Sequence, residues 1–465
     1  MKTLIAQKFQ SDPRVKKAKK LLSQALMDHQ KSLTGVKEPQ KRLKVSYEKL
    51  LAEFAQLRGQ SLYYPYLSSG IGKGALVELG DGSVKYDFIT GIGVHYFGHS
   101  HPGIMEANIS ASLEDTVMQG NLQQTSTSVE VMKRLVKLAG APLKHCFFSS
   151  SGAMANENAL KIIFQKKSPA NRLLAFKRCF AGRSLVTAQI TDKLENRKGL
   201  PEVLKVDYIP FFDPKHPQES TEQAVQALGE FLKLYPHQHA GMFFELVQGE
   251  GGFYEGNRNF FMSLMKILKE EKIAVVIDEI QTFGRTPKPF AFQYYELDSY
   301  VDVVTIGKML HVCATFFTEE FKPEPGLLSQ TFTASSSAFH TALFITEYFK
   351  KSKLFGANGK ITVYSKYFRD QLQKLHDNYP DWIQGPFGVG VMIGFTVFDG
   401  SAEKTKIFIQ ELFKSGVVSF LAGSHPSRVR FLVPIAVVTK KDIQNVCRII
   451  EQTLNEVAKR IKSHH

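Results

Sequence analysis

Five short, continuous runs of apolar residues, separated by segments of helical pattern, constrain the fold of this chain most strongly. The runs are HCFFS (145–149), RLLAFKR (172–178), AGMFFELV (240–247), IAVVIDEI (273–280) and DVVTIG (302–307). Apolar runs without polar alternation are typical of strands buried on both faces, as in a parallel sheet covered by helices. We therefore predict an α/β fold with a mainly parallel sheet, in which ligands bind at the carboxyl ends of the strands.

Segments on both sides of this region predict further domains. Amphipathic helices are predicted over residues 14–30 and 45–58, and long helices with short strands dominate beyond about residue 345. A chain of 465 residues is long enough for two domains. We expect a basic helical arm at 1–60, a large domain at 61–345 and a smaller α+β domain at 346–465.

The net charge of +15 is concentrated near the beginning of the chain. Residues 1–50 carry thirteen Lys or Arg against four Asp or Glu, which leaves +9 in that segment. A basic arm of this kind can contact phosphates, but this one has no interleaved aromatic residues and no recognisable nucleic-acid module. A solvated, lysine-rich helix face is the simpler interpretation, and we expect no nucleic-acid partner.

Composition also suggests a compartment. No run approaches the about 18 apolar residues of a membrane-spanning helix, and the lysine-rich start lacks the apolar core of a secretion signal. The four cysteines are too widely separated for a disulfide framework or a zinc site: Cys146, Cys179, Cys313 and Cys447. We expect a cytoplasmic protein with free thiols and no bound metal.

Two glycine-containing segments are candidate phosphate sites. GIGKG (70–74) lacks the first glycine and the Ser or Thr of a P-loop, and we interpret it as a turn. In the segment 149–163, by contrast, Ser151, Gly152 and Ala153 come directly before or at the first turn of a predicted helix. Unpaired N–H groups and the helix dipole favour an anion there. On this segment alone, a serine N-cap remains the simpler interpretation.

Two charged residues follow predicted strands. Asp278 lies at the carboxyl end of one apolar run, and Lys308 closes the run DVVTIG thirty residues later. In a parallel sheet these strand ends can lie close together. A carboxylate can keep a heterocyclic nitrogen protonated, and a lysine desolvated by apolar neighbours becomes nucleophilic toward an aldehyde. Together with the anion site, this pair suits pyridoxal 5′-phosphate.

The chain resembles the class III (ω-amino acid) aminotransferases of the type I pyridoxal-phosphate fold from about residue 75 to 440. Six motifs carry the resemblance: GIGVHYFGHSHP (91–102), SGAMANENALK (151–161), CFAGRS (179–184), FELVQGEGG (244–252), DEIQTFGRT (278–286) and VRFLVPIAVVT (429–439). The chain departs from the family pattern at Ala181, Leu246 and Val433. Within the family it looks most similar to lysine 6-aminotransferase and 4-aminobutyrate aminotransferase, and the two are not ranked.

The resemblance implies roles for the residues around the cofactor. Lys308 would bond to the cofactor aldehyde and later move the substrate proton, while Asp278 would hold the ring nitrogen. Gln281 would donate to the phenolate oxygen of the ring, and Phe180 would stack on the ring face. The cofactor phosphate would be bound by Ser151, Gly152 and Ala153, together with Thr331 from the neighbouring subunit. The resemblance thus implies an obligate homodimer.

The resemblance also assigns the substrate carboxylates. Arg183 and Arg430 would bind them, and Glu250 would pair with Arg430 until a dicarboxylic substrate arrives. We therefore expect transamination of a terminal amine of lysine, 4-aminobutyrate or ornithine, with 2-oxoglutarate as acceptor. Aminomutase or decarboxylase chemistry with the same cofactor, and a non-catalytic binding protein on the same fold, are the alternatives.

Overall fold

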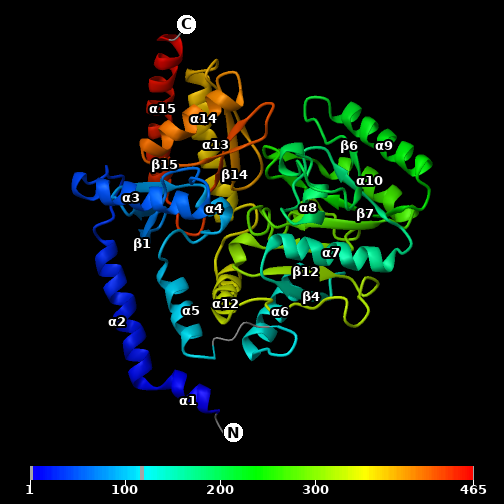
Figure 1. The fold of residues 1–465 in the computed structure, drawn as a ribbon, viewed down its shortest axis with the longest axis horizontal. Coiled ribbons are helices and arrows are strands. Elements are labelled where there is room, and N and C mark those ends of the chain that lie inside the picture. Colours follow the sequence, from blue (N-terminus) through cyan, green and yellow to red (C-terminus); the bar gives the residue numbers. More distant parts are fainter. Residues whose placement is uncertain (1–3, 116–119, 464–465) are drawn as a thin grey trace. The chain divides into compact units, whose positions relative to one another are not determined.

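A seven-stranded sheet forms the centre of the larger part of the protein. The computed structural model describes residues 4–115 and 120–463. Across the sheet the strand order is β4-β12-β11-β10-β7-β5-β6. The strands are β4 (His145–Ser149), β5 (Arg172–Phe176), β6 (Lys205–Ile209), β7 (His239–Phe244), β10 (Ala274–Glu279), β11 (Val303–Ile306) and β12 (Cys313–Phe317). In Figure 1 these strands run from teal (β4) through green to yellow-green (β12), with helices around them.

The sheet is mainly parallel, as its apolar runs predicted. Strands β11, β10, β7, β5 and β6 pair in parallel, and only β12 runs antiparallel to both of its neighbours. Every residue of β5, β7, β10, β11 and β12 is buried, which explains why these strands lack polar alternation. All five predicted strands are confirmed.

Helices of this part pack against the sheet and against each other. Helix α7 (Gly152–Lys166) contacts β4, β7, β10, β11 and β12, and buries apolar residues at helical spacing. Helix α9 (Pro217–Leu234) packs against α10 (Arg258–Glu270). Shorter elements are α8 (Leu185–Ile190), η1 (Leu194–Asn196), β8 (Val247–Gln248), β9 (Tyr254–Glu255), α11 (Ala291–Tyr294) and η2 (Lys308–Leu310).

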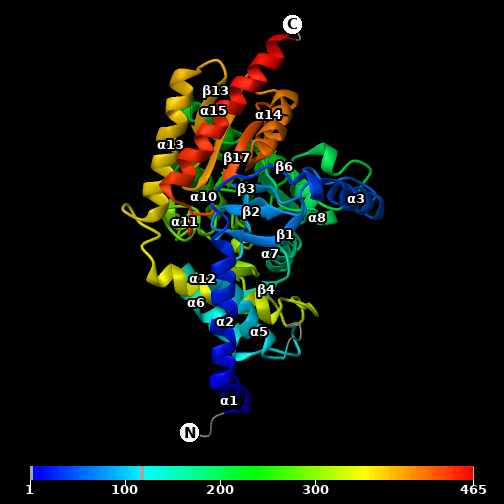
Figure 2. The same ribbon diagram turned by 90° about the vertical axis from the view of Figure 1, so that its left-hand side faces the viewer.

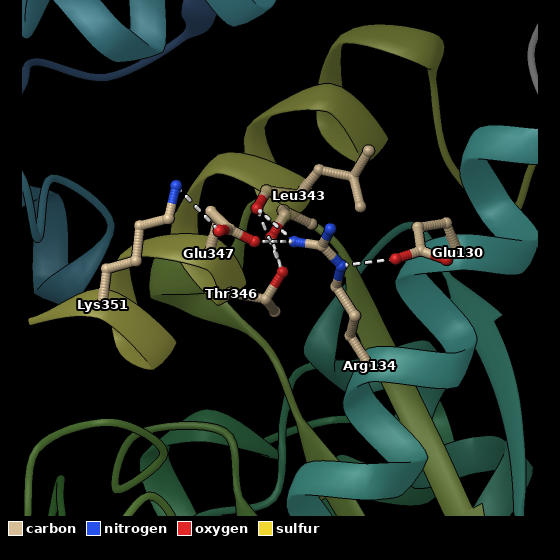
Figure 3. Close-up of polar contacts among 7 residues, drawn as sticks. Glu130, Arg134, Leu343, Thr346, Glu347 and Lys351 are labelled. Atoms are coloured by element: carbon tan, nitrogen blue, oxygen red, sulfur yellow. Dashed lines mark hydrogen bonds and ion pairs between the residues drawn. The ribbon is translucent and has the colours of Figure 1, made fainter.

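An ion-pair network joins α6 (Ser126–Ala139) to α12 (Ser336–Lys351). Arg134 on α6 donates from Nε to Glu130 at 2.7 Å and from Nη1 to Glu347 at 2.8 Å. Lys351 pairs with the other oxygen of Glu347 at 3.0 Å, so the four charges alternate in sign (Figure 3). Because these side chains are partly exposed, the network orients the two helices more than it stabilises them.

A second compact unit contains both ends of the chain. It has two four-stranded sheets, ordered β1-β2-β3-β15 and β13-β14-β17-β16. Its strands are β1 (Ser68–Lys73), β2 (Leu76–Leu79), β3 (Val84–Asp87), β13 (Ile383–Phe387), β14 (Met392–Val397), β15 (Val417–Val418), β16 (Phe420–Ala422) and β17 (Arg428–Leu432). Its helices are α1 (Ile5–Ser11), α2 (Pro13–Gln30), α3 (Lys41–Arg58), α4 (Thr90–Gly93), α5 (Pro102–Ser112), α13 (Lys360–Asn378), α14 (Ala402–Lys414) and α15 (Lys440–Ser463). Figure 2 shows α2 along α5, where Lys19 donates to Ser110 at 2.8 Å.

The predicted helices are confirmed, but the prediction of one turn is wrong. The segment GIGKG (70–74), interpreted as a turn, belongs to strand β1 up to Lys73 because Gly72 and Lys73 pair with Val77 and Leu76 on β2. Among the described residues, no helix has both the length and the apolar character needed to cross a membrane.

The compact units are discontinuous in sequence. One consists of residues 1–114, 363–386 and 393–465, and the other of 115–362 and 387–392. The three expected domains, 1–60, 61–345 and 346–465, are each a continuous segment of the sequence. Their boundaries stay a prediction.

Candidate active site

Two neighbouring parallel strands place Asp278 and Lys308 at the same edge of the sheet. Asp278 on β10 pairs with Thr305 on β11, and Lys308 follows β11 two residues after its end. The neighbouring carboxyl group, that of Glu279, has a different role. It accepts the backbone N–H groups of Ala291 at 2.9 Å and Phe292 at 2.8 Å, at the start of α11. Asp278 and Glu279 therefore contact different elements, because successive side chains along a strand point to opposite faces of the sheet.

A cavity of about 220 Å³ lies at this edge of the sheet. Residues from the start of α7, the loop after β5 and the ends of β7, β10 and β11 line it. The lining residues are Gly152, Ala153, Asn156, Phe180, Ala181, Gly182, Glu245, Asp278, Ile280, Gln281 and Lys308. Six predicted cofactor residues, Gly152, Ala153, Phe180, Asp278, Gln281 and Lys308, are thus brought together in one cavity.

Lys308 occupies an unusual backbone conformation at the wall of this cavity. Its φ is +49°, in the left-handed region that residues other than glycine rarely adopt, and it begins the 3-10 turn η2. The next residues, Met309 and Leu310, are fully buried, which anchors the turn. Strained positions of this kind cluster at functional sites because the surrounding packing must hold them.

The electrostatics of the cavity are set by buried carboxyl groups. Burial raises the pKa of Asp278 to about 6, although hydrogen bonds from Ile280 and Asn156 and the charge of Lys308 act in the opposite direction. Burial, followed by the nearby charge of Asp278, raises the pKa of Glu245 to about 8. A cation next to Asp278 would offset the cost of burying its charge.

The start of α7 provides the predicted anion site. Ser151 is the N-cap, and its hydroxyl accepts the N–H of Met154 at 3.2 Å. Gly152 and Ala153 are the first helical residues, whose N–H groups have no acceptor within the helix, and both line the cavity. Serine capping and an anion site, which were alternatives for this segment, can therefore coexist.

The remaining predicted residues do not line the cavity. Thr331 and Arg183 are exposed, and Glu250 is half-buried close to the end of β8. Arg430 is fully buried on β17 of the other compact unit, with its guanidinium 5.6 Å from the centre of the Phe420 ring. Their roles stay predictions.

Asn156 and Glu245 line the cavity although the sequence assigned them no role. Glu245 accepts the N–H of Phe180 at 2.7 Å, and Asn156 donates to the carbonyl of Ala181 at 2.7 Å. Both side chains hold the loop that carries Phe180. Both residues lie inside quoted motifs, SGAMANENALK and FELVQGEGG, and that was the only signal in the sequence that could have found them.

The donors and acceptors of the cavity fit pyridoxal 5′-phosphate. Asp278 offers a buried carboxylate for a protonated ring nitrogen, and the start of α7 offers free N–H groups for a phosphate. The Oε1 atom of Gln281 is buried and receives no hydrogen bond from the described residues, so the side chain has an acceptor available to a donor in the cavity. Lys308 supplies the amine.

Known proteins with similar sequences are aminotransferases. The chain is 29% identical over 403 residues to the acetylornithine aminotransferase of Methanocaldococcus jannaschii, covering 83% of this chain and 93% of the relative. It is 28% identical over 422 residues to a probable 4-aminobutyrate aminotransferase of Bacillus subtilis, covering 83% and 94%.

Solved structures show the same fold. Lysine aminotransferase from M. tuberculosis superimposes with a TM-score of 0.79 at 22% identity, over 88% of this chain and 99% of that one. The ornithine aminotransferase from Toxoplasma gondii gives a TM-score of 0.77 at 22% identity, over 89% and 96%. The class-III aminotransferase family matches residues 65–454. The chain therefore belongs to the class-III aminotransferases, and it is a pyridoxal-phosphate-dependent enzyme of the type I fold.

Proposed function

We propose that this enzyme transfers the terminal amine of an amino acid to 2-oxoglutarate, with lysine, 4-aminobutyrate or ornithine as the amino donor. The observation that carries the proposal is that Lys308, Asp278, Gln281, Phe180 and the start of α7 line one cavity. The range of donors named for the similar proteins supports a terminal amine, and it adds N-acetylornithine to the candidates.

Within this proposal, the cofactor would supply an aldehyde that bonds to amines and a ring that withdraws electrons from the carbon bearing the amine. Lys308 would hold the cofactor through its amine and, once free, would move a proton at the amine-bearing carbon of the substrate. The Asp278 carboxylate keeps the ring nitrogen protonated. Gln281 contacts the ring oxygen, and Phe180 covers one face of the ring.

The phosphate and the substrates need further groups. Ser151, Gly152 and Ala153 bind the phosphate at the helix N-terminus, and Thr331 of a second copy completes that site. This assignment requires a homodimer, which we place in the cytoplasm. The family resemblance of CFAGRS and VRFLVPIAVVT supports Arg183 and Arg430 as carboxylate ligands, with Glu250 pairing Arg430 when the donor has only one carboxylate.

Absorbance spectroscopy of the purified protein tests the proposal. Lysine, 4-aminobutyrate, ornithine and N-acetylornithine are added one at a time, and the correct donor should bleach the visible band of the lysine-bound cofactor. Addition of 2-oxoglutarate should then restore it. If many equivalents of a donor per active site are consumed without any 2-oxo acid, aminomutase or decarboxylase chemistry replaces transamination.

A lysine variant tests the assignment of the reacting amine. After borohydride reduction, peptide mapping should find the cofactor on Lys308. Lys308→Ala should carry no reducible bond to the cofactor, whereas Lys288→Ala, which changes an exposed lysine between β10 and α11, should retain it. A reducible bond in Lys308→Ala would show that another amine reacts.

A further inference from the structure

Asn156 on α7 uses every polar atom of its side chain. Its Nδ2 atom donates to the carbonyl of Ala181 at 2.7 Å and to Oδ2 of Asp278 at 2.8 Å. Its Oδ1 atom accepts the hydroxyl of Thr305 at 2.7 Å. The side chain is 1% exposed, so water cannot replace any of these partners.

The partners determine which way the amide points. A backbone carbonyl and a carboxylate can only accept, so both must face the NH₂ group of Asn156. Exchanging the nitrogen and oxygen would set an acceptor against both of these acceptors, so it is the oxygen of the amide that faces the Thr305 hydroxyl and accepts from it. Thr305 therefore satisfies the buried amide oxygen in the one orientation that donates to Asp278.

The same contacts hold Asp278 from two sides. Its Oδ1 atom accepts the N–H of Ile280 at 2.8 Å, and its Oδ2 atom accepts from Asn156. Each carboxylate oxygen has a second lone pair, and Asp278 lines the cavity, so these donors fix the group without exhausting its capacity. The charged or titratable side chains that line the cavity with Asp278 are Lys308 and Glu245.

We propose that Asn156 is a positioning residue that holds the Asp278 carboxylate for the ring nitrogen of the cofactor, and that Thr305 holds Asn156. This inference rests on the role proposed above for Asp278. It extends that role because the position of the carboxylate that meets the ring nitrogen then depends on a series of hydrogen bonds. The series runs from Thr305 on β11, through Asn156 on α7, to Asp278 on β10. The donation from Asn156 also favours the ionised carboxylate against the effect of burial.

The holoenzymes of Asn156→Ala and Thr305→Val test this series of hydrogen bonds. Thr305→Val keeps the shape of the strand residue but removes the hydroxyl, so the buried Oδ1 atom of Asn156 loses its donor. Both variants should bind pyridoxal 5′-phosphate about 10- to 100-fold more weakly in equilibrium dialysis, because Asn156→Ala removes a hydrogen bond to a charged group and Thr305→Val leaves a buried acceptor beside that group unpaired. The pH at which the visible absorbance of bound cofactor titrates should shift in the same direction as in Asp278→Asn. Thr305→Ser should restore both properties.

A matched variant separates positioning from packing. Asn158 is also 1% exposed and lies on α7, but it does not line the cavity. Asn158→Ala should leave the cofactor affinity and the titration unchanged. If Asn156→Ala behaves like Asn158→Ala in both measurements, the inference is wrong. If Asn156→Ala does not fold, Thr305→Val decides alone, and wild-type values there would overturn the inference. If Asp278→Asn itself has wild-type values, the proposed role of Asp278 fails instead.

Discussion

Glu245 accepts the backbone N–H of Phe180 at 2.7 Å and the backbone N–H of Gly249 at 3.1 Å. One buried carboxyl group at the end of β7 thus ties the loop that carries Phe180 to the loop beside Gln281, which the structure places against Gly249. Burial of this carboxyl group has a cost in free energy when the group is ionised, because its charge is poorly solvated there.

That cost predicts how stability depends on pH. Burial raises the pKa of Glu245 from 4.5 to about 8, so the unfolded chain loses this proton while the folded protein keeps it. Unfolding then releases a proton between about pH 4.5 and pH 8, and the free energy of unfolding should fall as the pH rises through this window. The dependence should be absent below the window and level off above it. Glu279 and Asp278 act in the same direction, with pKa values raised to about 7 and about 6.

Unfolding of Glu245→Gln should release one proton fewer than unfolding of the wild type, so its stability should depend less on pH. In cofactor-free protein, the slope of unfolding free energy against pH between about 6 and 8 should become shallower by up to about 1.4 kcal/mol per pH unit. Chemical denaturation at several pH values measures it. Glu222→Gln, which changes an exposed acid on α9, should leave the slope unchanged. Equal slopes in wild type and Glu245→Gln would mean that Glu245 is ionised throughout this range.

Gly182 allows the loop that carries Phe180 to approach α7. Its φ is +141°, and a Cβ atom there would lie 2.6 Å from the Thr187 hydroxyl and 3.0 Å from the Ala153 side chain. Gly182→Ala should therefore lower the unfolding free energy by about 1–3 kcal/mol and weaken cofactor binding, because Ala153 lines the cavity. Thermal denaturation and equilibrium dialysis measure the two effects.

Gly229→Ala is the matched control for that substitution. Nothing lies within 4 Å of a Cβ atom at this position on α9, so the change should stabilise the protein by about 0.5–1 kcal/mol and leave cofactor binding unaltered. If Gly182→Ala were as stable as wild type, the close packing of this loop on α7 would be wrong.

Much of the sheet and the central pair of residues could be predicted from the sequence. The apolar runs identified five strands, and because β10 and β11 are parallel neighbours, polar residues that end them had to meet. Asn156 could not be found in this way. Its partners Asp278 and Thr305 are 122 and 149 residues away in the chain, and no local spacing encodes such contacts. The strand at GIGKG was missed for a related reason: its pairing partner β2 defines it, whereas its glycines suggested a turn.

The network around Arg134 should contribute little to stability despite its good geometry. The Arg134 side chain is 32% exposed, and the side chains of Glu130 and Glu347 are 47% and 33% exposed. Arg134→Met should lower the unfolding free energy by about 1 kcal/mol or less, and the difference should shrink at high salt. Lys366→Met, which breaks a single exposed pair with Asp370 within one helix, should cost less still. A loss of several kcal/mol at Arg134 would indicate that α6 and α12 depend on this contact.

Arg430 offers a direct test of how the substrate carboxylate is bound. A guanidinium can form two parallel hydrogen bonds with a carboxylate, whereas the ammonium of lysine cannot reproduce this geometry. If Arg430 binds 2-oxoglutarate, Arg430→Lys should raise the KM for 2-oxoglutarate about 10- to 100-fold, with a smaller effect on the donor that carries a single carboxylate. Steady-state kinetics with both substrates varied measure the two KM values. Arg428→Lys changes a second buried arginine on the same strand and should alter neither KM by more than about threefold, a difference below 1 kcal/mol. Equal changes in Arg428→Lys and Arg430→Lys would mean that β17 tolerates lysine poorly, and Arg430 would lose its assigned role.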